Sequence, residues 1–196
     1  MKRIFLFVFA MALFQAGFSQ SKSSYKKSSQ LGIQFTAHDF ETPADLNSKG
    51  MSFVLSDNQW SNFDRKKVGM AITYTKPLND NLDFNARLGM SDVEYTLSNK
   101  PHASGTGSRT FFEMDANLFM KLLTDDHIVS PFLSIGAGAS LWKGYYAAYI
   151  PAGVGLQVNL FDETFLILQS QYRIPVTGNS ANNLFFSIGV SAVLDK

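Results

Sequence analysis

The segment 145–175 contains two stretches in which apolar and polar residues alternate, joined by an acidic turn at 161–164. In the first stretch, the apolar face consists of Ala148, Ile150, Ala152, Val154, Leu156, Val158 and Leu160. A period of two residues indicates a β-strand with one apolar and one polar face. The first stretch exceeds the usual strand length of about 5–6 residues. It suits a tilted strand that crosses a lipid bilayer, which needs about 9–11 residues.

The same alternation predicts six further strands. They span residues 31–38, 68–76, 82–95, 110–122, 129–142 and 184–194. Near Asp92 the alternation changes phase, which is typical of a β-bulge or of a strand leaving the membrane. The predicted long connections are 39–66, 97–108 and 176–183, and the predicted short turns are 77–81, 124–127, 143–144 and 161–164. Apart from 143–144, long loops alternate with short turns, as in bacterial outer-membrane barrels.

The composition of the polar faces decides which side of the barrel they occupy. Lys and Glu dominate surfaces that face water, whereas these faces are rich in Gly, Ser, Thr, Asn and Gln. Small residues suit the crowded interior of an eight-stranded barrel. Three basic and three acidic residues also lie on these faces, and we expect them to form a neutral polar network: Asp83, Arg87, Glu113, Asp115, Lys121 and Arg173. The predicted fold is all-β, an eight-stranded antiparallel up-and-down transmembrane barrel with a closed interior.

Aromatic residues gather near the ends of the predicted strands. Tyr95, Trp142, Tyr145, Tyr146, Tyr149 and Tyr172 lie at the long-loop ends, and Phe161 and Phe165 lie at the short-turn end. Tyr and Trp are enriched at membrane interfaces. We therefore expect these residues to form two aromatic girdles.

The amino terminus is typical of a secretory signal peptide over residues 1–19, with a basic start and an apolar run of 11 residues at 4–14. A flexible tail is expected at 20–30 and the barrel at 31–196. Removing the signal peptide leaves 15 basic and 16 acidic residues, a net charge of −1, which does not suggest nucleic acid as a partner. Cysteine is absent, so disulfides and thiolate metal sites are excluded. No later apolar run reaches the roughly 18 residues of a membrane helix.

The chain contains three histidines that are candidates for catalysis. His38 lies beside Asp39 at the loop end of its strand, where we expect a rim histidine in a polar network. His102 and Ser104 form a His-x-Ser pair within a Pro- and Gly-containing loop. Lipid A deacylases use such a pair on a strand, so the loop position argues against catalysis. His127 lies in a short turn with no further indication of chemistry.

The first long connection offers two kinds of binding site. Asp39, Glu41 and Asp45 are oxygen ligands that suit Ca²⁺, but their spacing matches no calcium loop, and we interpret them as solvated rim charges. Aromatic and basic residues follow, namely Trp60, Phe63, Arg65, Lys66 and Lys67. They suit contact with lipopolysaccharide phosphates or a surface partner. The alternative is that these side chains pack on the barrel rim.

Several stretches resemble the small outer-membrane β-barrel proteins of the Bacteroidetes, of the porin-family or OmpA-like amino-terminal type. The resemblance lies in Leu31–Leu46, Leu82–Tyr95 and Lys143–Thr177, together with the last predicted strand. It implies an outer-membrane location and an eight-stranded barrel, without the peptidoglycan-binding domain of larger relatives. None of these stretches is a catalytic motif.

We interpret the chain as a monomeric outer-membrane barrel with a structural or surface-interaction role, without catalytic activity or cofactor. The expected partners are outer-membrane lipid, lipopolysaccharide and other surface proteins. Three alternatives remain open from the sequence. A small-solute channel requires an open interior. A lipid-modifying enzyme requires a His–Ser or His–acid pair near the outer leaflet, for which His38 and His102 are the candidates. A secreted soluble ligand-binding barrel requires the apolar faces to point inward.

Overall fold

The computed structural model describes most of the chain beyond the expected signal peptide. The described residues are 28–50, 52, 66–92, 110–125, 127–142, 145–161, 163–177 and 181–194. Within them, no helix has the length and apolar character needed to cross a lipid bilayer.

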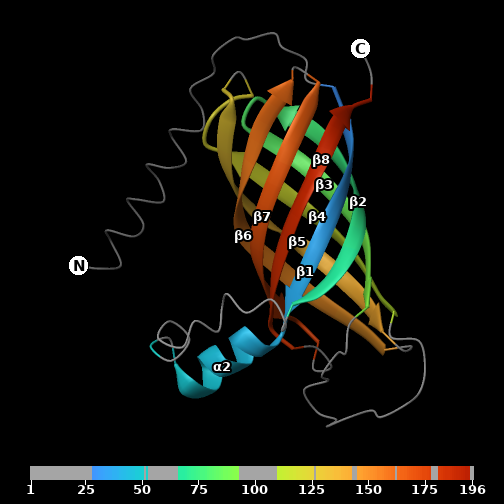
Figure 1. Ribbon diagram of the computed structural model, residues 1–196, viewed down its shortest axis with the longest axis vertical. Helices are drawn as coiled ribbons and strands as arrows, with labels where there is room; N and C mark the ends of the chain where they lie inside the picture. Colours follow the sequence, from blue (N-terminus) through green and yellow to red (C-terminus); the bar gives the residue numbers. More distant parts are fainter. Residues whose placement is uncertain are drawn as a thin grey trace.

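Eight antiparallel strands form a single closed barrel in which each strand pairs with its neighbours in sequence (Figure 1). The strands are β1 (Gln30–Asp39), β2 (Lys67–Asn79), β3 (Leu82–Asp92), β4 (Thr110–Lys121), β5 (Val129–Trp142), β6 (Tyr145–Phe161), β7 (Thr164–Pro175) and β8 (Asn183–Val193). Pairing between β1 and β8 closes the sheet, so no strand edge is left open. The predicted fold of eight antiparallel strands in up-and-down order is confirmed.

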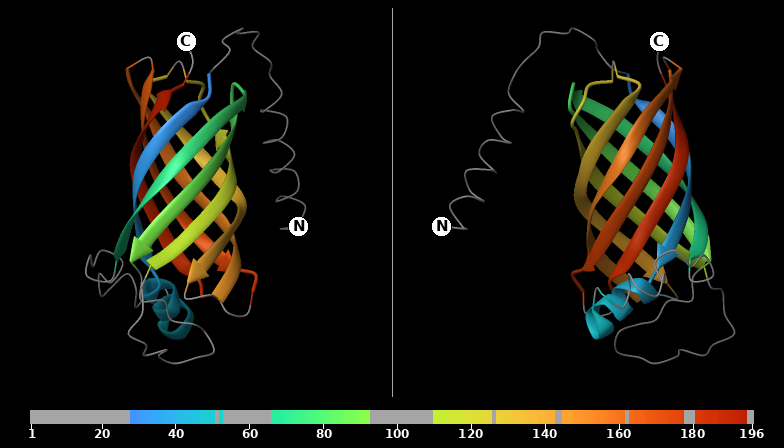
Figure 2. Two further views of the ribbon diagram at one scale, coloured as in Figure 1. Left: turned by 90° about the vertical axis from the view of Figure 1, so that its right-hand side faces the viewer. Right: turned by 60° about the vertical axis from the view of Figure 1, so that its left-hand side comes forward.

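The two ends of the barrel differ. The helix α2 (Glu41–Lys49) lies beyond one end, which we call the loop end (Figure 2). At the opposite end, the turn end, short connections join β2 to β3, β4 to β5 and β6 to β7. β1 begins and β8 finishes at the turn end, where the amide of Leu194 donates to the carbonyl of Ser29 at 2.8 Å.

The strands expose their apolar faces on the outside of the barrel and bury their polar faces inside. Ile33, Phe35 and Leu88 are 60%, 63% and 63% exposed on the outside. Inside, Gln34, Thr73 and all six predicted interior charges are buried. This is the reverse of a soluble barrel, and the expectation of a polar interior is correct.

The largest differences from the predicted strand boundaries are at the ends of β2 and β3. β2 continues to Asn79 because Pro77 and Asn79 still pair with β3, across a register shift between them. β3 ends at Asp92, where the alternation changes phase. The residues 93–95 lie outside the described part of the chain.

The helix α2 was not predicted, since the connection 39–66 was expected to be a loop throughout. The buried carboxylate of Asp39 accepts the backbone amides of Glu41 at 3.0 Å and Thr42 at 2.9 Å, which satisfies free donors at the first turn. Pro43 is compatible with this first turn because proline has no backbone N–H that would need an acceptor there. Gly50 follows the helix with a φ of 85°, a conformation that favours glycine.

The expected aromatic girdles are only partly correct. Trp142, Tyr149 and Phe165 are 6%, 5% and 3% exposed and point into the barrel. Tyr146 is on the outside at the loop end and is 74% exposed, whereas Tyr145 pairs with Trp142, shares its inward parity and is 40% exposed. Aromatic residues that point inward cannot contact a membrane interface. The direction of the side chain therefore decides whether an aromatic residue belongs to a girdle or to the interior. Tyr95 and the side chain of Phe161 lie outside the part of the chain that the structure describes.

Candidate functional site

Four charged side chains from three strands meet inside the loop-end half of the barrel. We call Arg87 from β3, Glu113 and Asp115 from β4, and Arg173 from β7 the loop-end layer. Arg87 and Asp115 are direct cross-strand partners, which brings the two side chains together on the inner face. All four residues are at most 6% exposed.

Each charge in the loop-end layer contacts two charges of opposite sign. Arg173 Nη1 lies 2.6 Å from Glu113 Oε2, and its Nη2 lies 3.5 Å from Asp115 Oδ2. Arg87 Nη2 lies 3.3 Å from Glu113 Oε1, while its Nε donates to Asp115 Oδ2 at 3.1 Å. Its Nη2 also contacts Asp115. Buried charges require such compensation, and here the cations and carboxylates are equal in number.

Neutral groups fix the position of the layer. The hydroxyl of Tyr149 donates to Asp115 Oδ2 at 3.1 Å, and the amide of Asn117 donates to Asp115 Oδ1 at 2.6 Å. Tyr149 lies flat over Gly138, where an added Cβ would be 2.5 Å from the ring. Both guanidiniums lie over the ring of Phe185, with Arg87 Cζ at 3.9 Å and Arg173 Cζ at 3.8 Å from its centroid. Such cation–π contacts add to the electrostatic stabilisation.

His38 lies against the loop-end layer and is fully buried, so the expectation of a residue on the rim is wrong. Its Nε2 is 3.6 Å from Glu113 Oε2. The imidazole packs against Phe40, Phe111 and Phe185 with ring centroids 6.1, 5.5 and 5.3 Å away. His38 therefore contacts the polar network within an aromatic setting, and the apolar cluster of Phe111 with Trp142 lies nearby at the loop end.

A second charged group lies near the turn end. We call Asp83, Lys121 and Asp125 the turn-end cluster. Lys121 Nζ lies 2.6 Å from Asp83 Oδ2 and 2.7 Å from Asp125 Oδ1. Gln157 also donates to Asp125 Oδ1 at 2.7 Å. The sequence reading missed Asp125 because it assigned the residue only to a turn, although its position four residues after Lys121 was visible.

The six interior charges named from the sequence thus fall into two groups. Neutral and apolar side chains fill the space between the groups. Gln169 donates to Ser134 at 3.2 Å, and Asn85 donates to Thr75 at 2.8 Å. The rings of Phe119 and Phe132 stack with centroids 4.5 Å apart beside Ile167.

The acidic residues of the first connection have structural partners. Asp39 is buried and caps α2, which corrects its interpretation as a solvated rim charge. Asp45 pairs with Lys49 at 3.0 Å across one helical turn. Among the described residues, no group of three His, Cys, Asp or Glu side chains is arranged to hold a metal ion.

The structure describes only some of the remaining candidate residues. Trp60, Phe63, Arg65, His102 and Ser104 lie outside the described residues. Lys66 lies at the loop end on the outer face, with its ammonium 4.9 Å from the ring centroid of Phe186. His127 is exposed beside Thr124 at the turn end.

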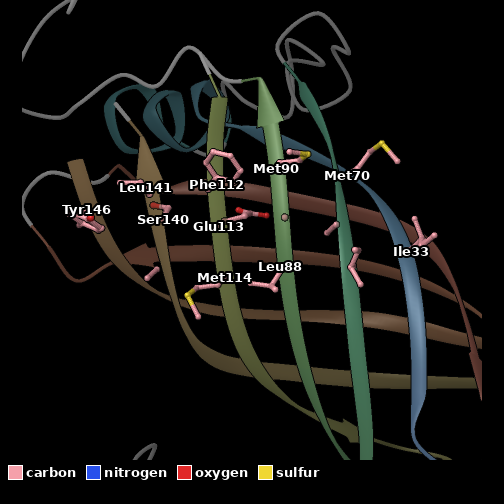
Figure 3. Close-up of a pocket in the computed structure, with 14 residues that line it drawn as sticks. Ile33, Met70, Leu88, Met90, Phe112, Glu113, Met114, Ser140, Leu141 and Tyr146 are labelled. Atoms are coloured by element: carbon pink, nitrogen blue, oxygen red, sulfur yellow. The ribbon is translucent and has the colours of Figure 1, made fainter. Parts of the chain in front are cut away.

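Two apolar grooves cross the outer face of the barrel. The first has a volume of about 700 Å³ and spans β1 to β6, with Met70, Leu88 and Met114 projecting from neighbouring strands (Figure 3). A hollow that shares Met70 and Met90 continues it towards Asp92 at the loop end. The second groove, of about 760 Å³, spans β1 and β5 to β8 and includes Lys66. The two grooves differ in the charge at their loop ends.

Comparison with family models and with curated proteins gives no match to this sequence. Among solved structures, the chain is similar to the N-terminal β-barrel domain of Pseudomonas aeruginosa OprF. The TM-score is 0.52 with 10% identity, covering 85% of this chain and 97% of that domain. At this identity the likeness concerns the fold alone, a closed β-barrel.

Two further structures are similar at lower scores. Ail of Yersinia pestis has a TM-score of 0.46 and 12% identity, covering 84% of this chain and 95% of Ail. Neisserial surface protein A has a TM-score of 0.45 and 14% identity, covering 85% of this chain and 96% of that protein.

Proposed function

We propose that the protein is an integral outer-membrane barrel with a structural or surface-interaction role and no catalytic activity. The observation that carries this proposal is the outward apolar face. Side chains such as Ile33, Phe35 and Leu88 are more than half exposed in the closed barrel. In water, exposed apolar surface costs about 25 cal/mol per Å² relative to burial. A lipid environment removes this cost, and a closed barrel satisfies its own backbone hydrogen bonds there.

The interior supports a structural role in preference to a channel. The loop-end layer links β3, β4 and β7 through buried ion pairs, and the turn-end cluster links β3 with the end of β4. Moving solutes through this interior would require separating these charges. The connections 39–66 and 97–108, at the loop end, are the regions we assign to contact with lipopolysaccharide and surface proteins.

Membrane fractionation with a heat-modifiability gel tests the location. We expect the protein to sediment with membranes, to require detergent for extraction, and to migrate differently after boiling. Recovery in the soluble fraction without detergent would overturn the proposal. It would support the alternative of a secreted soluble barrel.

Protease treatment of intact cells tests the orientation and the role of the loop end. Trypsin added outside is expected to cleave after Lys49, within the connection 39–66, and to leave Lys27, ahead of β1 on the turn-end side, uncut. Cleavage at Lys27 only after the outer membrane is opened completes the expected pattern. The reverse pattern would place the turn end outside and exclude the assigned interaction surface.

A further inference from the structure

The second outer groove combines an apolar path with a cation at one end. Its upper bank is a row of cross-strand partners that runs across six strands, consisting of Val68, Ala37, Phe186, Ser170, Val154 and Leu133. Its lower bank is the adjacent row of Phe35, Ile188, Leu168, Leu156 and Pro131. Ala37 and Ser170 are the short side chains of the upper bank, and they leave room between the two rows.

The groove has the dimensions of a lipid chain. From β1 to β5 it crosses four inter-strand spacings, which corresponds to about 19 Å. One leaflet of the hydrocarbon core is about 15 Å thick. An acyl chain lying in the groove therefore contacts both banks over most of its length.

Lys66 determines which headgroup suits this groove. Its side chain crosses the outer face near the small Ala37, and its ammonium reaches the ring of Phe186 on β8. The ammonium therefore lies at the loop end of the groove. The first groove has the opposite character, because its continuation carries the exposed carboxylate of Asp92 at the same end.

We propose that the Lys66 groove binds a phosphorylated glycolipid of the outer leaflet, with a headgroup phosphate on Lys66 and an acyl chain between the two rows. This proposal rests on the proposed function, since the loop end must face the outer leaflet. A phosphate and an ammonium form a charge-assisted contact, and cations at a membrane surface attract anionic lipids. The first groove repels the same headgroup through Asp92.

Native mass spectrometry of the full chain in detergent tests the proposal, with lipid A and its dephosphorylated form as probes. Lys66→Ala is expected to lower the bound fraction of lipid A about fivefold. It should leave binding of the dephosphorylated form unchanged. Lys76→Ala is the matched control, because Lys76 is exposed near the turn end of the same strand.

A second pair of variants tests the acyl-chain path without changing charge. Ser170→Leu fills the upper bank and is expected to weaken both lipid forms, whereas Ala116→Leu fills the outer face near the first groove and is expected to weaken neither. Equal effects of Lys66→Ala and Lys76→Ala, or equal binding of both lipid forms to the unaltered protein, would overturn the proposal.

The heat-modifiability gel separates the two possible failures. A variant that still shows the mobility shift is a folded barrel, so unchanged lipid A binding by folded Lys66→Ala rejects the lipid site alone. Recovery of the unaltered protein in the soluble fraction rejects the proposed function itself, and the lipid site with it.

Discussion

The two charged groups inside the barrel differ in how their charges are balanced. In the loop-end layer, two guanidiniums and two carboxylates form a ring in which every charge contacts two partners. In the turn-end cluster, both Asp83 and Asp125 contact the same ammonium of Lys121. The side chain of Asp125 is 12% exposed, whereas no charged side chain of the layer exceeds 2%.

This difference shows how the position of a charge determines the compensation that it requires. Deep in the barrel, desolvation is severe, and equal numbers of opposite charges are needed. Near the end of the barrel, water screens a surplus carboxylate and lowers the cost. The surplus carboxylate, Asp125, therefore lies where water reaches it.

Removing one carboxylate of the layer should have the largest effect. Asp115→Leu leaves two buried guanidiniums with one carboxylate, and it should lower the free energy of unfolding by about 3–5 kcal/mol. Urea unfolding in phospholipid vesicles measures the change. The double variant Arg87→Met with Asp115→Leu restores the charge balance and should recover part of the loss. An equal loss of unfolding free energy in the single and double variants would show that charge imbalance is not the cause.

Removing the surplus carboxylate of the turn-end cluster should have an intermediate effect. Asp125→Ala is expected to lower the free energy of unfolding by about 2 kcal/mol, because Lys121 loses one charged partner but keeps its contact with Asp83. The exposed Lys76→Met, on the outer face, is the control and should leave stability unchanged. A loss as large as that of Asp115→Leu would show that the two groups do not differ.

Removing one neutral donor should have the smallest effect. Tyr149→Phe deletes a hydrogen bond to Asp115 but leaves its contacts with both arginines and Asn117, so about 1 kcal/mol is expected. The same unfolding measurement applies. Tyr146→Phe is the matched control, since Tyr146 is 74% exposed on the outer face. If both variants lose the same stability, the hydroxyl of Tyr149 does not support the layer.

Strand parity accounts for what the sequence predicted well. Each residue in a strand points to the opposite side from its neighbour, so the alternation alone placed Arg87, Asp115 and Arg173 on one face. It also gave β5 its observed bounds of Val129–Trp142. Parity is a local property of the chain, and it survives any error in strand register.

Features that depend on contacts between segments far apart in the sequence could not be predicted from the alternation. Which carboxylate meets Arg173 depends on the register and stagger of β4 and β7, which are not neighbours in the sheet. Trp142 and Tyr149 were assigned to a girdle from residue type, although their parity indicated the interior. The helix α2 was missed because a nine-residue helix within a polar connection has a weak periodic pattern.

Phe185 gives the layer a consequence for spectroscopy. Both guanidiniums lie over its ring, so the protons of Arg87 and Arg173 lie above one aromatic π-system. The ring current shields protons in those positions and moves their NMR signals upfield. A pair of upfield guanidinium resonances is therefore an intrinsic label of the assembled layer, and rotation of either side chain away from the ring would return its signal to the ordinary range.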